Sequence, residues 1–271
     1  PESLTHEKLQ VLCDGGVNRL SIGIQSFNPV HRQTLLRRGS PAAYQNILRR
    51  VRESGFTNVN VDLIYGIPGQ TVADWMMDVS MALDYGVTHL STYGLTLEEG
   101  TALATKPCVR VEDAVQVDMW EAAGRLAAAR GLRRYEVSNL AIPGKECGHN
   151  LAIWYGATYL GCGPAASSFD GAVRWTNPAD LDVWLRGAAP MYDELAPNLR
   201  AAELLAFGLR TTMGWDLAVF QEQTGFDAMT LRGDAIESLA ADGLLQVDGS
   251  SLCPTERGLL FADTIAVRLL Q

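Results

Sequence analysis

The sequence predicts an α/β fold: a partial, TIM-like (βα) barrel followed by a small helical, winged-helix-like module. Three segments that alternate like strands are each followed by a helical segment, with a period of roughly 30–35 residues, as in βαβ units that form a parallel sheet. The sequence contains no Gly-x-Gly-x-x-Gly turn, which argues against a dinucleotide-binding sheet and favours the arc of a barrel. After Trp184 the pattern changes to helices and a hairpin.

The first half of the chain supplies the strands and helices of this series in order. Pro41 is expected in the first turn of a helix, where its fixed φ is favourable. Thr71, with Asp74 three positions later, predicts a helix that begins with a variant of the capping box. The expected strands cover 19–25, 59–64, 89–97 and 134–137, and the expected helices cover 3–13, 41–54, 71–85 and 112–130.

The last third of the chain has the outline of a winged-helix module. Helices are expected over 201–212, 217–224 and 231–242, before a hairpin that turns at Asp248-Gly249. The segment in the position of a recognition helix, LRGDAIESLAADG, is net acidic, which favours packing or partner binding over DNA binding. We therefore expect two domains, 1–184 and 185–271.

Composition excludes several classes of function. A net charge of −9 over 271 residues argues against a nucleic-acid partner, which would need a basic face. No apolar run reaches the length of a membrane span. The cysteines are odd in number, scattered and without a Cys-x-x-Cys pair, which predicts reduced thiols in the cytoplasm and no zinc or cluster motif.

Polar residues near the ends of the expected strands form a first candidate site. Gln25, Asp62 and Thr96 are placed at the C-terminal ends of their strands, the rim at which barrels bind ligands, and Arg37 follows the first strand. One amide, one guanidinium and one carboxylate would hold a ribose and an amino-acid carboxylate. The alternative, which spacing alone favours, is that these side chains bond to nearby backbone. The turn at Gly66 would pass under the flat face of a ligand, or is an ordinary βα turn.

The stretch 135–168 contains a second candidate site. His149-Asn150 followed by Trp154 would ligate haem iron through the imidazole, with the indole stacked on the macrocycle. The alternative is a structural histidine, which is the commoner role of a lone His. Cys147 is a weaker candidate as a thiolate ligand.

Together these motifs resemble the radical SAM family of oxygen-independent coproporphyrinogen III oxidases and their relatives, the HemW-type haem chaperones. The resemblance covers residues 18–271 and rests on strings in the family's order: NRLSIGIQSF, VNVDLIYGIPGQT, LSTYGLTLEEGT, YEVSNLAIPGKECGHNLAIW and YLGCGPAASS. A full member also carries an N-terminal Cys-x3-Cys-x2-Cys for a [4Fe–4S] cluster and a Gly-rich SAM strand, and this sequence has neither.

The resemblance implies roles for individual residues. Gln25, Arg37 and Asp62 match positions that contact S-adenosylmethionine (SAM), and Thr96 falls where the backbone of family members meets SAM. Gly39 stands where many relatives have His.

The segment at His149 matches the His-Asn-x-x-Tyr-Trp motif that is linked to haem handling in the chaperone branch. Ile153 replaces the tyrosine of that motif, so a role of its hydroxyl is lost or passes to Tyr155.

Two functions follow from the resemblance. The first is a haem chaperone that binds SAM and haem, with a haem-acceptor protein as partner and a cluster only if an N-terminal part is present. The second is the oxidative decarboxylation of coproporphyrinogen. A third alternative is a cluster-less fragment with neither activity. If 271 residues are the entire protein, we expect no radical chemistry, because no three-cysteine site exists to supply an electron.

Overall fold

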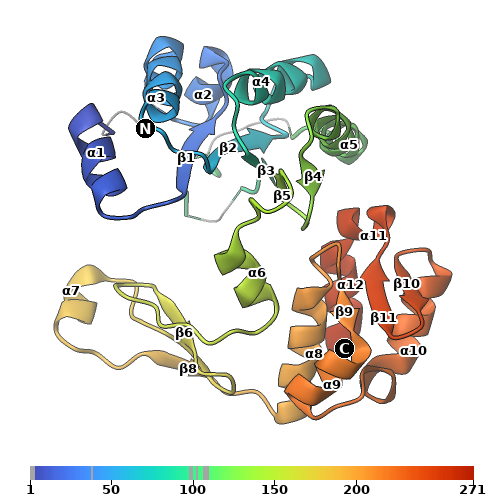
Figure 1. The fold of residues 1–271 in the computed structure, drawn as a ribbon. Coiled ribbons are helices and arrows are strands. Elements are labelled where there is room, and N and C mark those ends of the chain that lie inside the picture. The colour runs from blue at the N-terminus through green and yellow to red at the C-terminus, as the bar shows by residue number, and fades with distance from the viewer. Residues whose placement is uncertain (1–3, 38, 98–99, 102, 106–109) are drawn as a thin grey trace. The chain divides into compact units, whose positions relative to one another are not determined.

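A computed structural model describes residues 4–271 apart from 38, 98–99, 102 and 106–109 (Figure 1). The chain divides into two compact units, unit 1 (Pro1–Glu146) and unit 2 (Cys147–Gln271). The domain boundary expected at 184/185 was drawn from a change in residue pattern and stays a prediction. Each unit has its own hydrophobic core.

Unit 1 is built on a five-stranded sheet with the order β1-β2-β3-β5-β4. The first three strands are parallel, and β5 and β4 are antiparallel additions, so the sheet is mixed and does not close. This open arc confirms the predicted partial barrel. The elements are α1 (His6–Asp14), β1 (Leu20–Gln25), α2 (Pro29–Thr34), α3 (Pro41–Glu53), β2 (Val59–Tyr65), α4 (Val72–Asp84), β3 (His89–Gly94), α5 (Asp113–Ala129), β4 (Arg133–Arg134) and β5 (Asn139–Ala141).

Local hydrogen bonds explain where two of these helices begin. The Thr71 hydroxyl accepts from the Asp74 amide at 3.1 Å while the Asp74 carboxylate accepts from the Thr71 amide at 3.0 Å, so the predicted capping box is confirmed. The sequence analysis missed α2, although its signals are present. Asn28 caps it by accepting from the Val30 amide at 2.9 Å, and Pro29 occupies its first turn.

The strand expected over 134–137 is wrong in extent. Regular pairing stops after Arg134, because the chain turns at once: the Tyr135 amide donates to the Asn139 carbonyl at 3.1 Å, and the Glu136 carboxylate accepts from the Ser138 amide at 3.1 Å. The turn reverses the chain into β5, which pairs antiparallel with β3. The strand expected over 89–97 also ends earlier, at Gly94.

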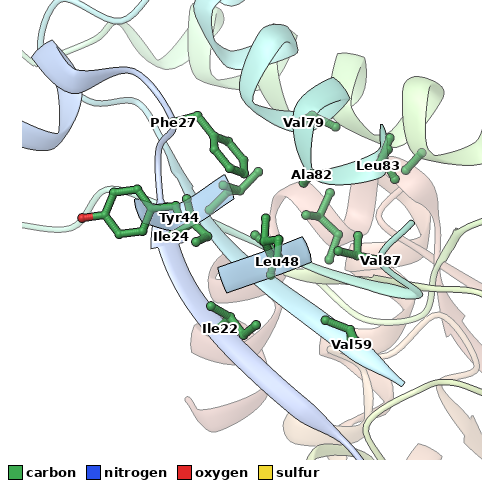
Figure 2. Close-up of a cluster of buried hydrophobic side chains, with 14 of the residues drawn as sticks. Ile22, Ile24, Phe27, Tyr44, Leu48, Val59, Val79, Ala82, Leu83 and Val87 are labelled. Atoms are coloured by element: carbon green, nitrogen blue, oxygen red, sulfur yellow. The ribbon is translucent and has the colours of Figure 1, made fainter. Parts of the chain in front are cut away.

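The core of unit 1 lies between one face of the sheet and the helices that follow its strands (Figure 2). Ile22 and Ile24 of β1 and Val59 of β2 point toward Leu48 of α3 and Val79 of α4 (Figure 2). Complete burial of a large aliphatic side chain contributes about 1.5–3 kcal/mol, so this apolar face holds the sheet against its helices. The opposite face of the same strands is left for polar side chains.

Unit 2 combines a small sheet with the predicted winged-helix module. The small sheet has the order β6-β7-β8, and the sequence analysis did not predict it. The expected hairpin and the helices expected over 217–224 and 231–242 are confirmed, with a second sheet of order β10-β11-β9, whereas the helix expected over 201–212 lies four residues earlier, at Pro197–Gly208. The elements are α6 (Gly148–Trp154), β6 (Ser167–Phe169), β7 (Arg174–Thr176), α7 (Leu181–Leu185), β8 (Met191–Asp193), α8 (Pro197–Gly208), β9 (Trp215–Asp216), α9 (Leu217–Thr224), α10 (Ala228–Ala241), β10 (Leu245–Asp248), β11 (Ser251–Pro254), α11 (Glu256–Leu260) and α12 (Ala262–Leu270).

Trp215 forms the centre of the winged-helix core. Its indole N–H donates to the Leu205 carbonyl at 3.2 Å, and its ring lies edge-on to Phe220 at 5.3 Å between centroids. A Cβ at Gly208 would come within 2.1 Å of the indole nitrogen, so glycine is required there for the ring to pack against α8.

Candidate functional site

The candidate ligand-binding surface of unit 1 is the polar face of its sheet. Successive side chains of a strand point to opposite faces, so the apolar residues of β2 enter the core while Asn60 and Asp62 point the other way. Strand register aligns these two residues with polar neighbours on adjacent strands. The two aligned rows are Ser21–Asn60–His89 and Gly23–Asp62–Ser91–Asn139.

Gln25 and Asp62 flank Gly23 on this face. A Cβ built at Gly23 would lie 2.8 Å from the Gln25 amide nitrogen and 3.9 Å from a carboxylate oxygen of Asp62. Glycine therefore leaves open a gap that any side chain would fill. The structure thus brings together two of the three side chains that the sequence predicts for a nucleoside ligand.

The backbone at Gln25 is strained. Its φ of 70° is unusual for a residue other than glycine, and the β1–β2 register shifts between Gly23 and Gln25. Gln25 ends β1 as predicted, whereas Asp62 lies inside β2 and Thr96 comes after β3 has ended at Gly94. The expectation that all three sit at strand ends is therefore wrong for Asp62, because β2 continues to Tyr65.

The turn after β2 is tightly packed. Gly66 has a φ of 74°, and a Cβ there would lie 2.9 Å from the Gln116 amide oxygen. The buried Gln70 side chain accepts from the Ile67 amide at 3.2 Å and so braces the turn from within. The positive φ explains the glycine, and its role toward a ligand stays a prediction.

Arg37 and Thr96 are both exposed. The Arg37 amide donates to the Arg32 carbonyl at 2.9 Å, which places Arg37 directly after α2. Within the part of unit 1 that the structure describes, the Arg37 guanidinium makes no hydrogen bond or ion pair with Gln25 or Asp62. Their convergence on one ligand therefore stays a prediction.

Asp62 is connected to a line of buried polar side chains that the sequence analysis did not identify. Asn60 donates to an Asp62 oxygen at 2.7 Å and lies 2.7 Å from Nδ1 of His89, whose Nε2 lies 2.9 Å from the Tyr135 hydroxyl. Burial, with the Arg19 guanidinium nearby, lowers the His89 pKa from 6.5 to about 3, so the ring is neutral at physiological pH. The period-two alternation of β2 and β3 was the signal that placed these side chains on one face.

The second candidate site lies in unit 2, on the short helix α6. His149 is exposed, and Ile153 stands four residues later on the same face of the helix. Asn150 is half-buried. Trp154 packs edge-on against Phe207 with centroids 6.0 Å apart, and the Arg210 guanidinium lies 5.2 Å from its ring centre. Stacking of Trp154 on a macrocycle stays a prediction.

Tyr155 anchors the end of α6. Its hydroxyl lies 2.6 Å from the Thr211 hydroxyl and donates to the Gly214 carbonyl at 3.0 Å, and burial raises its pKa. The ring also lies edge-on to Trp215 at 5.0 Å. These contacts give the Tyr155 hydroxyl a structural task within unit 2.

A pocket of about 330 Å³ opens beside α6 within unit 2. Its walls are largely apolar and aromatic, and Ile153 and Gly156 contribute the edge next to α6. Tyr159, Phe169, Leu204 and Phe207 line it further in. No sequence pattern predicted it, because its walls come from β6, β7, α8 and the loops between them.

Two arginines and two carboxylates form a closed charge network on the polar side of this pocket. Arg174 binds Glu203 in a bidentate pair at 2.9 Å for each contact, and Arg200 pairs with the same carboxylate. Asp193 lies 3.3 Å from Arg174 and 3.4 Å from Arg200. Burial alone would raise the Glu203 pKa, but the hydrogen bonds and charges of both arginines outweigh it and lower that pKa. The polar side of the pocket is therefore charge-balanced.

Neither unit presents a ready cluster of metal ligands among its described residues. No three His, Cys, Asp or Glu side chains come together there as a metal site. No helix in the described ranges is both long and apolar enough to cross a membrane.

Comparison with protein families gives two matches. Residues 1–82 match the model of the radical SAM superfamily, and residues 195–261 match the model of the HemN C-terminal domain.

Individual proteins match over nearly the whole chain. A heme chaperone HemW from Mycobacterium tuberculosis is 35% identical over 280 residues, covering 100% of this chain and 70% of the relative. The heme chaperone HemW of Bacillus subtilis is 30% identical over 275 residues, covering 98% of this chain and 73% of the relative. The structure of coproporphyrinogen III oxidase (HemN) from Escherichia coli, a radical SAM enzyme, aligns with a TM-score of 0.82 at 21% identity, covering 98% of this chain and 67% of that one. This last likeness concerns the fold.

Proposed function

The chain belongs to the radical SAM family of HemW haem chaperones, and from this premise we propose that it is itself a haem-binding chaperone that also binds SAM. The observation that carries the proposal is the extent of the match, since two relatives named as heme chaperones align over 98–100% of the chain. The partners that this function requires are haem and a haem-acceptor protein. A cytoplasmic location agrees with the scattered cysteines and stays part of the proposal.

We place the haem on the face of α6 that carries His149 and Ile153. The exposed imidazole of His149 is a suitable axial ligand for the iron. Ile153, one turn further along, forms the edge of the apolar pocket. A macrocycle bound through His149 would thus extend one edge into the pocket, where Phe169 and Phe207 supply aromatic contacts.

The charge balance of the pocket determines which edge of the haem macrocycle enters it. Arg174 and Arg200 are paired with Glu203 and Asp193, so the pocket offers no spare cation for a carboxylate. We therefore assign the pocket to the apolar methyl and vinyl edge, with the propionates directed to solvent. A volume of about 330 Å³ suits such a partial insertion.

Haemin titration of matched variants tests this assignment. His149→Ala should change the Soret band because the axial ligand is lost, whereas Ile153→Glu should weaken binding at least about tenfold with an unchanged band, since a charge enters an apolar edge. Ala152→Glu is the control, because it adds the same charge to an exposed neighbouring position of α6. Identical spectra for wild type and His149→Ala would remove His149 from the site. Equal effects of Ile153→Glu and Ala152→Glu on haemin affinity would contradict binding of the haem edge in the pocket.

We place SAM on the polar face of unit 1. The gap at Gly23, flanked by the Gln25 amide and the Asp62 carboxylate, suits the hydroxyl groups of a ribose. Arg37 would bind the amino-acid carboxylate through its forked donors, Gly66 would lie under the flat ring, and the backbone at Thr96 would complete the site. SAM with a [4Fe–4S] cluster supplies one-electron chemistry when both are bound. The described residues offer no ligand set for that cluster, and we derive no step through it.

Calorimetric titration with SAM tests the Arg37 assignment. Arg37→Ala should weaken binding by about 1.5–3 kcal/mol, the range for a hydrogen bond to a charged group. Arg50→Ala, a change of an exposed arginine on α3, is the control and should leave the affinity unchanged. If Arg37→Ala binds SAM as wild type does, Arg37 does not contact the ligand.

A further inference from the structure

The row of polar side chains between Asp62 and Tyr135 has a single hydrogen-bonding direction. The Asp62 carboxylate can only accept, so the Asn60 group 2.7 Å away is its NH2 group. That NH2 group also donates to the Ser21 hydroxyl at 2.7 Å. The Asn60 oxygen therefore faces the other way, where it accepts from the Ser91 hydroxyl at 3.2 Å.

The orientation of Asn60 fixes the tautomer of His89. Nδ1 of His89 lies 2.7 Å from the Asn60 oxygen, which can only accept, so Nδ1 carries the ring proton. The ring is neutral, and its bare Nε2 accepts from the Tyr135 hydroxyl at 2.9 Å. The direction runs from the Tyr135 hydroxyl through His89 and Asn60 to the Asp62 carboxylate without a conflict between donors.

Burial makes this direction hard to reverse. His89 is fully buried and Asn60 nearly so, while Asp62 is only partly covered. If the Asn60 amide were turned over, its oxygen would face the Asp62 carboxylate and its NH2 group would face the His89 N–H. Acceptor would then face acceptor and donor would face donor, and none of these hydrogen bonds could form. The network therefore ends in one partly exposed group, the Asp62 carboxylate, which accepts from the buried Asn60 and from the Ser21 hydroxyl at 3.4 Å.

We propose that Asn60 and His89 are positioning residues that hold the Asp62 carboxylate toward the gap at Gly23, with the Tyr135 hydroxyl as the donor that supports the His89 tautomer set by Asn60. The proposal rests on the proposed binding of SAM at this face for its consequence in affinity. Its structural content is independent of the ligand. Stabilisation alone does not require such a network, since a well-packed apolar set is often as stable as a buried polar one.

Asn60→Asp tests the proposal without a ligand. The new carboxylate keeps the shape of the amide but faces Asp62, and two carboxylates in contact release their protons in two separated steps. Carbon-13 NMR of the carboxyl groups of the chain should show this coupled titration. Asn139→Asp is the control, because Asn139 is also buried on this face but is separated from Asp62 by β3. An Asp62 signal that titrates alike in wild type and Asn60→Asp overturns the proposal.

SAM affinity then separates the positioning role from the proposed function. The change in SAM affinity with pH should be about tenfold larger in Asn60→Asp than in wild type, because the proton shared by the two carboxylates competes with the ligand. A pH profile parallel to that of wild type, in a variant whose two carboxyls titrate together, would also overturn the positioning role. Failure of the wild type to bind SAM would contradict the proposed function, and the NMR result would still decide the network.

Tyr135→Phe tests the far end of the same row. Loss of its hydroxyl should weaken the preference of His89 for the Nδ1–H tautomer, as nitrogen-15 shifts of the ring report, and should lower SAM affinity about three- to tenfold. Tyr44→Phe is the control, because Tyr44 is another buried tyrosine that packs in the core of unit 1. It should change neither the His89 tautomer nor the SAM affinity. An unchanged His89 tautomer in Tyr135→Phe would show that Tyr135 does not belong to this row of polar side chains.

Discussion

Unit 1 and unit 2 both bury polar side chains next to a candidate ligand site, but they satisfy them with different chemistry. In unit 1 the buried members are neutral, a histidine, an asparagine and a tyrosine, and the row ends on the partly exposed Asp62. In unit 2 the members are charged, with Arg200 buried and Arg174 and Glu203 half-buried, and Glu203 closes the network by pairing with both arginines. The network in unit 1 ends on a carboxylate without a charged partner in that row, whereas the network in unit 2 pairs each of its charges with an opposite one.

The difference indicates which kind of ligand each surface can bind. A neutral, directional row orients a carboxylate that still has lone pairs available for hydroxyl donors. A balanced cluster leaves no unpaired charge, so the pocket beside it is suited to apolar surface. The proposed nucleoside in unit 1 and the proposed apolar edge of a macrocycle in unit 2 agree with this contrast.

Glu203→Gln should give the largest loss of stability in unit 2. Removal of this carboxylate leaves Asp193 as the only carboxylate in the described network for Arg174 and Arg200, and breaking this half-buried pair should cost up to about 3 kcal/mol, the low end of the range for a fully buried pair. Urea unfolding, followed by hydrogen exchange of α8, would measure the loss. Glu222→Gln, at an exposed position of α9, is the control. A change below about 1 kcal/mol would show that the cluster is not a closed, buried network.

His89 makes the stability of unit 1 depend on pH in a range where the unit 2 network does not respond. The unfolded chain binds a proton at His89 below its ordinary pKa of 6.5, but the folded chain does so only near 3, so stability is lost as the pH falls between these values. The expected loss from pH 7 to pH 5 is about 2 kcal/mol. For Glu203, whose pKa is lowered from 4.5, stability is lost only below that ordinary value.

Hydrogen exchange of β2 and β3 at the two pH values would measure this effect. Burial raises the pKa of Asp78 and acts with the opposite sign, so the informative comparison is the slope in wild type against that in His89→Gln. His89→Gln should flatten the slope, whereas His6→Gln, at an exposed position, should not. An equal slope in wild type and His89→Gln would contradict a neutral His89.

The same contrast explains how much of the molecule can be predicted from its sequence. Periodicity and caps predict α4 and the parallel strands β1, β2 and β3, because these depend on local patterns such as Thr71-Asp74. The motif predicts Gln25 and Asp62 as site residues, and the structure places both side chains beside Gly23. The Arg174–Glu203 network and its pocket are not predictable in this way, since their residues lie far apart in the sequence and meet only through tertiary packing. Asn60 and His89 were missed because each, taken alone, is an ordinary strand residue.

Tyr155→Phe should have an intermediate effect on unit 2. The variant keeps the ring against Trp215 but loses hydrogen bonds to Thr211 and Gly214, for a cost of about 1 kcal/mol. Urea unfolding would measure it, with Tyr192→Phe, at an exposed position of β8, as the control. If Tyr155→Phe also abolished haemin binding without loss of stability, the Tyr155 hydroxyl would serve the ligand and not the fold.

Asp84→Asn should have the smallest effect, although its ion pair is as short as the main pair of unit 2. Arg130 and Asp84 are 2.9 Å apart on the surface of unit 1, the same separation as Arg174 and Glu203, but their side chains are 44% and 60% exposed against 23% and 14%. Solvent screens the exposed pair and side-chain ordering opposes it, so its loss should cost at most about 0.5 kcal/mol. Urea unfolding in low and high salt would measure both variants. A cost for Asp84→Asn equal to that for Glu203→Gln would mean that distance, and not burial, sets the strength of the charge network in unit 2, and the contrast between the two units would then lose its basis.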